Sequence, residues 1–224
     1  MLGEAIGGLL PSAIAVALSP IPIVGVVLVL GTPRARASGS AFALGWVLGL
    51  AALSTLVVLA LGSGVDRDTE SGIEWFKVVV GIVFLLMAAR QWKKRPRDGE
   101  AVEMPKWMDS IASITAPRAA ALGAGLSGAN PKNLALTLAA SASISEAGLD
   151  RADTALAVFV FVALGSTTVA GAVLLYLLSP QRAAHPLASV GRFMSENSAV
   201  IMMVVLLLLG AKLLGDGLGG VASL

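Results

Sequence analysis

The sequence predicts an all-α membrane protein whose six transmembrane helices form two inverted three-helix repeats, with helices one and four broken. Three observations predict this fold class: a strongly apolar composition, six separate apolar stretches and a matched pair of helix-breaking clusters. Of the 224 residues, 56% are hydrophobic and 13% are charged, and the mean hydropathy is +0.85. These values are typical of polytopic membrane proteins and lie outside the range of soluble globular domains.

The six apolar stretches are each close to the length needed to cross a bilayer, about 20 residues. They cover residues 6–30, 41–61, 75–89, 119–142, 155–178 and 199–214. The first could also be a signal peptide, because Ala35-Arg36-Ala37 imitates a cleavage site. Its start carries Glu4 in place of a basic cluster and its apolar part is too long, so we interpret it as a membrane helix.

The basic residues of the predicted loops lie mostly on one side of the membrane. Two, Arg67 and Arg151, fall in the loops that follow spans two and four. Because basic loops stay in the cytoplasm, we expect a multi-pass protein of the plasma (inner) membrane with both termini extracytoplasmic. The eleven basic residues of the opposite loops are Arg34, Arg36, Arg90, Lys93, Lys94, Arg95, Arg97, Lys106, Arg118, Arg182 and Arg192.

The two helix-breaking clusters occupy corresponding places in the two halves of the chain. They read LSPIP at residues 18–22 and LSGANPKN at residues 126–133. They lie in spans one and four, an offset of three spans, which is an odd number, so the second half must cross the membrane upside down relative to the first. We therefore divide the chain into a first repeat (1–92), a cytoplasmic basic loop with a possible interfacial helix (93–117) and a second repeat (118–224).

Prolines in both clusters free backbone groups near the middle of the membrane. Pro20, Pro22 and Pro131 each remove a backbone donor and push away a carbonyl one turn earlier, where no bulk water is present. Any one of them could be a structural kink, but two clusters at matched depth favour a transport site. Lys132 adds an ammonium whose placement at the bilayer centre costs about 2.5 to 3.5 kcal/mol. It could snorkel to an interface; we expect it instead to face a cavity or pair with a polar group, and to bind an anionic phosphate, sulfate or carboxylate.

Five polar residues near these clusters are further candidates for contacting a substrate. Asn130 and Asn133 flank Lys132, and Ser19 and Ser127 stand in the two clusters. Thr167 belongs to a hydroxyl-bearing stretch near the middle of span five. Each can bond a polar substrate, and each can equally bond backbone groups of its own helix.

Several function classes are excluded or disfavoured by composition. The chain has no cysteine and one histidine, so we expect no metal, disulfide or other cofactor. The net charge of +2 and the placement of the basic residues indicate topology and no nucleic-acid partner. No nucleophile and base pair is visible, so an enzyme is the least expected class. No carboxylate lies in the middle of a span, so proton coupling would have to use Lys132, and the energy source stays open.

At these motifs the chain resembles the LysE superfamily of small exporters, which pair a proline-rich motif in helix one with Asn-Pro-Lys in helix four. The phrases LSPIPI, TPRARA, FALGWVLGL and NPKNL are similar to the GAP (Sap) family, the glycolipid-addressing proteins of mycobacteria and related actinobacteria. The resemblance implies export of envelope glycolipids or their building blocks across the plasma membrane. The amino-acid exporters have Gly where this chain has Ile21, which argues against an amino-acid substrate.

Together these observations predict a transporter or flippase for an anionic or glycosylated envelope lipid, with a lipid or glycolipid as its partner in the membrane. The alternatives are a LysE-type exporter of small polar solutes and a non-transporting accessory subunit of a lipid export complex. A homodimer and association with a larger lipid exporter both stay open.

Overall fold

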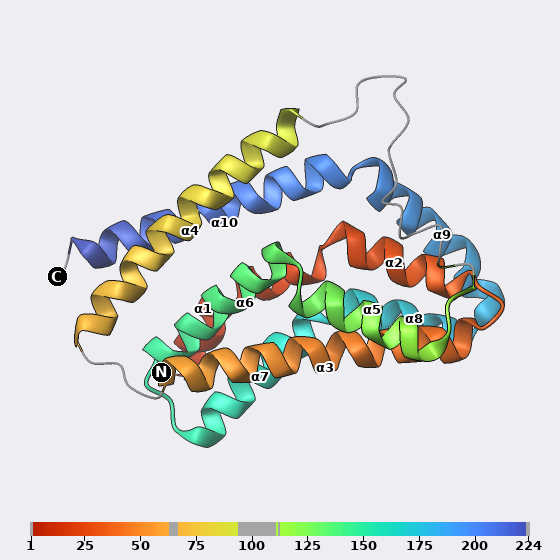
Figure 1. The fold of residues 1–224 in the computed structure, drawn as a ribbon, viewed down its shortest axis with the longest axis horizontal. Helices are drawn as coiled ribbons and strands as arrows, with labels where there is room; N and C mark the ends of the chain where they lie inside the picture. Colours follow the sequence, from red (N-terminus) through yellow and green to blue (C-terminus); the bar gives the residue numbers. More distant parts are fainter. Residues whose placement is uncertain (1, 63–66, 94–110, 112, 223–224) are drawn as a thin grey trace.

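The described part of the chain is helical throughout. The computed structural model describes residues 2–62, 67–93, 111 and 113–222, and Figure 1 shows how their helices are arranged. The predicted interfacial helix of the basic loop lies almost wholly outside the described residues. The helices are α1 (Leu2–Ala17), α2 (Pro20–Leu30), α3 (Ala35–Gly62), α4 (Arg67–Lys93), α5 (Ala116–Gly128), α6 (Pro131–Glu146), α7 (Arg151–Gly165), α8 (Thr167–Leu178), α9 (Pro180–Glu196) and α10 (Ser198–Val221).

Several of these helices are long and apolar enough to cross a membrane. By length and composition α3, α4 and α10 each qualify alone, and the bent pairs α1 with α2 and α7 with α8 raise the number to five among the described residues. Leu44, Leu48, Leu56 and Leu59 of α3 are exposed and recur at spacings of three, four and eight residues, as expected for a face that contacts lipid. The chain is therefore a multi-pass, all-helical membrane protein.

Both predicted interruptions are present. A bend of 48° separates α1 from α2, and α5 ends at Gly128 before α6 begins at Pro131. Pro20 and Pro131 each stand at the first position of the new helix, where the missing N–H needs no partner. The same prolines could not continue the preceding helix without a clash, so each helix stops just before them.

A third interruption was not predicted. Span five was expected to be continuous over residues 155–178, but α7 and α8 meet at a bend of 60° beside Ser166. No proline stands there. Gly165 packs closely on Val16 and Leu50, since a Cβ at this position would be 3.2 and 3.1 Å from their side chains. Contacts between helices, rather than a local sequence signal, accompany this break.

The segment between spans five and six, predicted as a basic loop, is the helix α9. Its buried residues Ala183, Leu187 and Gly191 recur every four residues, while Arg182 and Arg192 are exposed. This pattern is that of an amphipathic helix. A hydropathy window selects long apolar stretches and passes over such a helix, which explains the difference.

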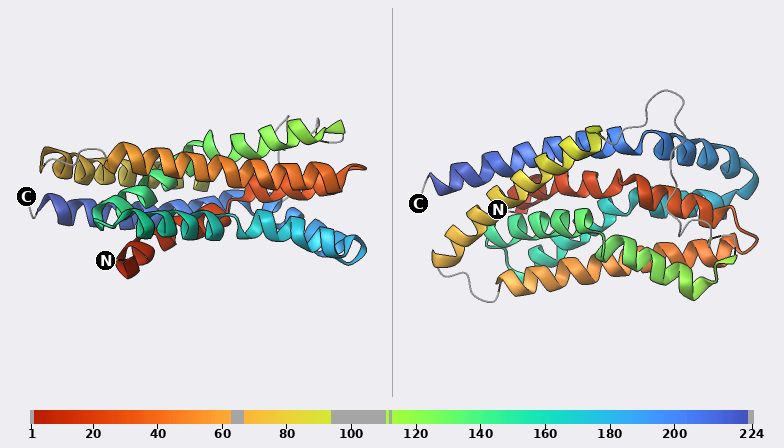
Figure 2. Two further views of the ribbon diagram at one scale, coloured as in Figure 1. Left: turned by 90° about the horizontal axis from the view of Figure 1, so that it is seen from below. Right: turned by 45° about the horizontal axis from the view of Figure 1, so that its top comes forward.

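Close packing through glycine joins the helices in pairs. The crossing of α4 and α10 is visible in Figures 1 and 2. A Cβ at Gly81 of α4 would be 2.7 Å from the backbone N of Leu214 in α10. On the other side of the molecule α3 packs along α5, where Gly45 and Gly123 allow backbone contact. Glycines of this kind let membrane helices approach closely.

Candidate functional site

The buried ammonium of Lys132 lies against the interrupted end of α1. Lys132 is 3% exposed. Its Nζ donates to the carbonyl of Ala15 at 2.8 Å and to Oγ of Ser19 at 2.6 Å. The predicted pairing of Lys132 with polar groups is thus observed, and it joins the two interrupted helices that the sequence singled out.

The end of α1 needs such partners because its last carbonyls have no intrahelical donors. Ala17, like Ala15, gives its carbonyl to a side chain of another helix, accepting from Oγ1 of Thr168 at 2.7 Å. Thr168 belongs to α8, directly after the third interruption. The breaks after α1, before α6 and before α8 therefore lie together, and side chains of the later helices satisfy the freed backbone of the first.

Asn133 and Ser19 complete this group of polar contacts between the three breaks. We call the group, which consists of Lys132, Asn133, Ser19 and Thr168 with the carbonyls of Ala15 and Ala17, the buried layer. Asn133 is fully buried, and its Nδ2 donates to the carbonyl of Leu126 across the α5–α6 break at 2.9 Å. Oγ of Ser19 lies 3.3 Å from Oδ1 of Asn133 and 3.3 Å from the carbonyl of Ala15. The hydroxyl that accepts from Lys132 thus has two oxygens toward which its own proton can point.

The other predicted site residues lie around the layer. Asn130 caps α6, its Oδ1 accepting from the backbone N–H of Lys132 at 3.1 Å. Ser127 is buried and donates to the carbonyl of Ala124 in its own helix. Pro20 and Pro22 are buried in the first turn of α2. The backbone of Pro131 begins α6, and its side chain lies outside the described part of the chain.

Thr167 lies away from the layer. It is exposed, and its hydroxyl donates to the carbonyl of Leu164 in the preceding helix at 2.8 Å. The neighbouring Thr168 makes the contact with α1. Sequence reasoning identified this hydroxyl-bearing stretch, but it could not decide which threonine faces the site, because that depends on the rotation of α8 about its axis.

The sequence analysis did not predict a row of hydroxyl side chains along α6. Thr137, Ser141 and Ser145 follow Asn133 at four-residue spacing, and their oxygens are buried without a hydrogen-bond partner among the described residues. Ser143, on the same helix, bonds back to the carbonyl of Ala139. An unpaired buried polar group costs about 1 to 3 kcal/mol, so this face is suited to water or a polar ligand. The four-residue spacing from Asn133 was the available signal.

A polar cavity of about 370 Å³, the α1–α6 cavity, lies on the side of the buried layer that faces the N-terminal end of α1 and the C-terminal end of α6. Of its lining residues on α1, Ser12 is the nearest to Ala15, three residues or about 4.5 Å away along the helix. Lys77 of α4 forms ion pairs there with Glu74 at 2.9 Å and with Glu146 of α6 at 2.8 Å. The lining residues are Glu4, Ala5, Gly8, Pro11, Ser12, Lys77, Ala139, Ser143, Glu146, Ala147, Leu209, Lys212, Leu213 and Asp216.

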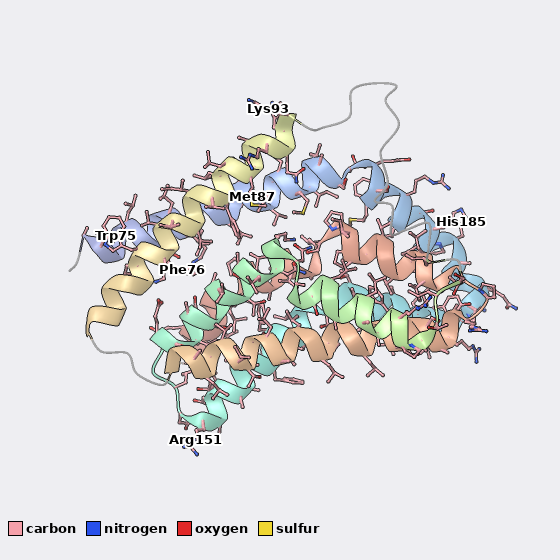
Figure 3. All side chains as sticks on the ribbon, viewed as in Figure 1. Trp75, Phe76, Met87, Lys93, Arg151 and His185 are labelled. Carbon is pink, nitrogen blue, oxygen red and sulfur yellow. The ribbon has the colours of Figure 1, made fainter. Side chains whose placement is uncertain are left out.

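A second and mostly apolar cavity of about 640 Å³, the α2–α9 cavity, lies beyond the break on the side of α2. Lys132 lines neither of these two cavities, so its ammonium is enclosed between them. The lining residues are Val24, Val27, Leu28, Gly31, Thr32, Pro33, Ile111, Ala188, Gly191, Arg192, Ser195 and Glu196. The side chains of Lys93, Arg151 and His185 project outward in Figure 3.

We expect the Lys77–Glu146 ion pair to couple α4 to α6 measurably. In a double-mutant cycle with Lys77→Met and Glu146→Gln, the coupling in the free energy of unfolding should be about 1 kcal/mol, because Lys77 is largely buried. Thermal unfolding in detergent measures it. The exposed pair Lys212–Asp216 within α10 is the matched control and should give a smaller coupling. Equal couplings would show that the pair does not fasten the two helices.

Comparison with known proteins identifies one family. The family model described as Sap, sulfolipid-1-addressing protein, matches residues 9–219, a range that includes all three helix breaks and both cavities apart from Glu4, Ala5 and Gly8. No curated protein and no solved structure matches the chain.

Proposed function

Because the chain belongs to the family of Sap, the sulfolipid-1-addressing protein, we propose that it is a membrane transporter or flippase for an anionic or glycosylated envelope lipid or its precursor. The family implies involvement in addressing or exporting sulfolipid-1. A multi-pass helical protein is suited to moving such a lipid across the membrane in which it is embedded, which we take to be the plasma membrane.

The observation that carries the proposal is a buried lysine amine bonded to neutral oxygens. Lys132 contacts a carbonyl and a hydroxyl, and the ion pairs of the described residues do not include it. An unneutralised charge at this depth is costly and is characteristic of substrate pathways in membrane proteins. The sulfate, phosphate or carboxylate of a lipid headgroup would supply the missing negative charge.

The surroundings of Lys132 support a transport cycle. One cavity lies on each side of the buried layer, as expected for an occluded state between two openings. The packing also supports an inverted repeat, in which α5 and α6 together form a sixth span. In this arrangement α1 packs on α6, and α2 packs on α5. Exchanging the two repeats converts one of these contacts into the other. Membership of the wider LysE superfamily is part of the same proposal.

An exporter of small polar solutes is the second candidate function. The charged lining of the α1–α6 cavity favours it, because a polar solute needs no lipid-accessible path. A non-transporting accessory role in a lipid export complex is the third reading, and the family description, which speaks of addressing, leaves room for it.

Reconstitution in liposomes tests the proposal. The purified protein should move a fluorescent sulfated glycolipid between leaflets faster than a zwitterionic analogue, with or without an imposed proton gradient. Ser19→Ala should slow this movement by about tenfold, because it removes a hydrogen bond to a charged group. Ser54→Ala is the matched control, since Ser54 is also buried and bonds back to its own helix, outside the breaks.

The other outcomes separate the alternatives. Movement of small polar solutes without lipid movement would favour the second candidate function. A folded protein that moves neither would contradict transport and favour the accessory role. Equal rates of lipid movement for Ser19→Ala and the wild type would show that the buried layer is not part of the transport pathway.

A further inference from the structure

The α2–α9 cavity combines apolar walls with a cation at its edge, and the buried layer around Lys132 makes no use of it. We propose that this cavity binds an anionic lipid, with an acyl chain along α2 and the acidic headgroup on Arg192. The inference rests on the proposed function, because it assigns the cavity as the place where the lipid substrate enters.

The size and walls of the cavity suit an acyl chain. Its volume of about 640 Å³ lies within the range of roughly 300 to 1,000 Å³ that is usual for small-molecule sites. Val24, Val27 and Leu28 of α2 form one wall, and Ala188 of α9 stands on the other. An apolar cavity of this kind takes up apolar ligands in preference to water.

Small residues on α9 keep the cavity open. Gly191 lies directly against Val27, since a Cβ added to it would be 2.9 Å from a methyl carbon of Val27. The two helices therefore meet at this point, and Ala188, one turn earlier, is too short to fill the space beside it. The cavity is thus bounded on one side by a close helix contact, and it is open where the exposed Ala188 and Arg192 line it.

The polar edge suits an acidic headgroup that also carries hydroxyls. Arg192 lines the cavity and has no ion pair among the described residues, although Glu196 stands one turn later on α9. A guanidinium binds sulfate, phosphate or carboxylate through two parallel hydrogen bonds. The carboxylate of Glu196, which also lines the cavity, can accept hydrogen bonds from sugar hydroxyls. An acidic glycolipid satisfies both groups.

The position of the cavity connects it to the buried layer. It extends along α2 from Val24 to Leu28 and on to Gly31 just after the helix, next to Arg34 in the α2–α3 connection and Arg36 in the first turn of α3. In the predicted orientation this is the cytoplasmic leaflet. From Val24 to Ser19 is five residues, or about 7.5 Å of helix, so a lipid held here has its path to Lys132 along a single helix.

Photocrosslinking in nanodiscs tests the site. An anionic lipid with a photoreactive acyl chain should label peptides of α2 and α9 in the wild type. Arg192→Gln should reduce this labelling by about tenfold, and Ala188→Trp should reduce it similarly by filling the cavity. The matched controls are Arg182→Gln and Ala184→Trp, exposed positions of α9 that do not line the cavity, and both should label like the wild type. A zwitterionic analogue should be insensitive to Arg192→Gln.

The outcomes distinguish this inference from the proposed function. If the wild type transports lipid but Arg192→Gln and Ala188→Trp label as strongly as the wild type, the inference is overturned and the proposed function stands. Labelling that depends on both residues, in a wild-type protein that moves no lipid, would confirm the binding site and overturn both its role as an entrance and the proposed function.

Discussion

Replacing Lys132 with methionine is expected to abolish lipid transport and to leave the stability of the folded protein nearly unchanged. Methionine has a similar length and no charge, so the variant keeps the packing of a side chain that is 3% exposed and removes an unneutralised buried ammonium. A lysine at the bilayer centre costs about 2.5 to 3.5 kcal/mol, but the variant also loses two hydrogen bonds, each worth about 1.5 kcal/mol or more when the donor is charged. The two effects offset each other, so the free energy of unfolding should stay within about 1 kcal/mol of the wild type.

The expected loss of transport is about 100-fold or more, since pairing a buried headgroup charge contributes about 3 kcal/mol. Thermal unfolding in detergent and the leaflet-transfer assay on the same preparation measure the two effects. Leu134→Met, at an exposed position of the same helix, is the control and should change neither.

The opposite pattern would show that Lys132 is a structural residue. If Lys132→Met unfolded more easily and the surviving protein still moved lipid, the ammonium would serve to hold the end of α1 through Ala15 and Ser19. A variant that is as stable as the wild type but inactive cannot be explained in that way.

The second large effect is expected where α3 meets α5. A methyl group at Gly45 would overlap the carbonyl of Ala120, and one at Gly123 would overlap the carbonyl of Phe42. Backbone cannot turn aside as a side chain can, so Gly45→Ala and Gly123→Ala should each lower the free energy of unfolding by about 3 kcal/mol. Transport should fall as well, because displacing α5 moves the break that positions Lys132.

Gly125→Ala is the matched control on the same helix. Nothing lies within 4 Å of a Cβ at that position, and alanine is favoured over glycine inside a helix by up to about 1 kcal/mol. This variant should be as stable as the wild type or more so. Equal losses at Gly123 and Gly125 would mean that the α3–α5 contact is not close, and thermal unfolding of the three variants decides the matter.

The parts of the fold that could be predicted are those with a local chemical cause. Pro20 and Pro131 end helices wherever they stand, and a lysine in an apolar stretch requires polar partners, so the breaks and the environment of Lys132 followed from the sequence. The orientation of the chain and the division into repeats rest on the same kind of pattern and stay predictions.

The parts that could not be predicted depend on how helices are rotated against one another. The break at Ser166 lacks a proline, and α9 lacks the apolar run that a hydropathy window detects. Choosing Thr168 over Thr167, or finding that Thr137 is buried without a partner, requires knowing which side of α8 or α6 faces the interior. Rotation of this kind is set by packing between helices, and periodicity within one helix does not determine it.

The three interruptions have a mechanical consequence because they lie at one level. Among the described residues, main-chain hydrogen bonds end or begin at Ser19, Asn130 and Ser166 and do not cross them, whereas in a continuous helix such bonds stiffen the axis. The segments above and below that level can tilt against each other through a few backbone torsions, and no further main-chain bond has to break. The three breaks therefore act together as a hinge, and bending of the molecule costs least at the level of Lys132.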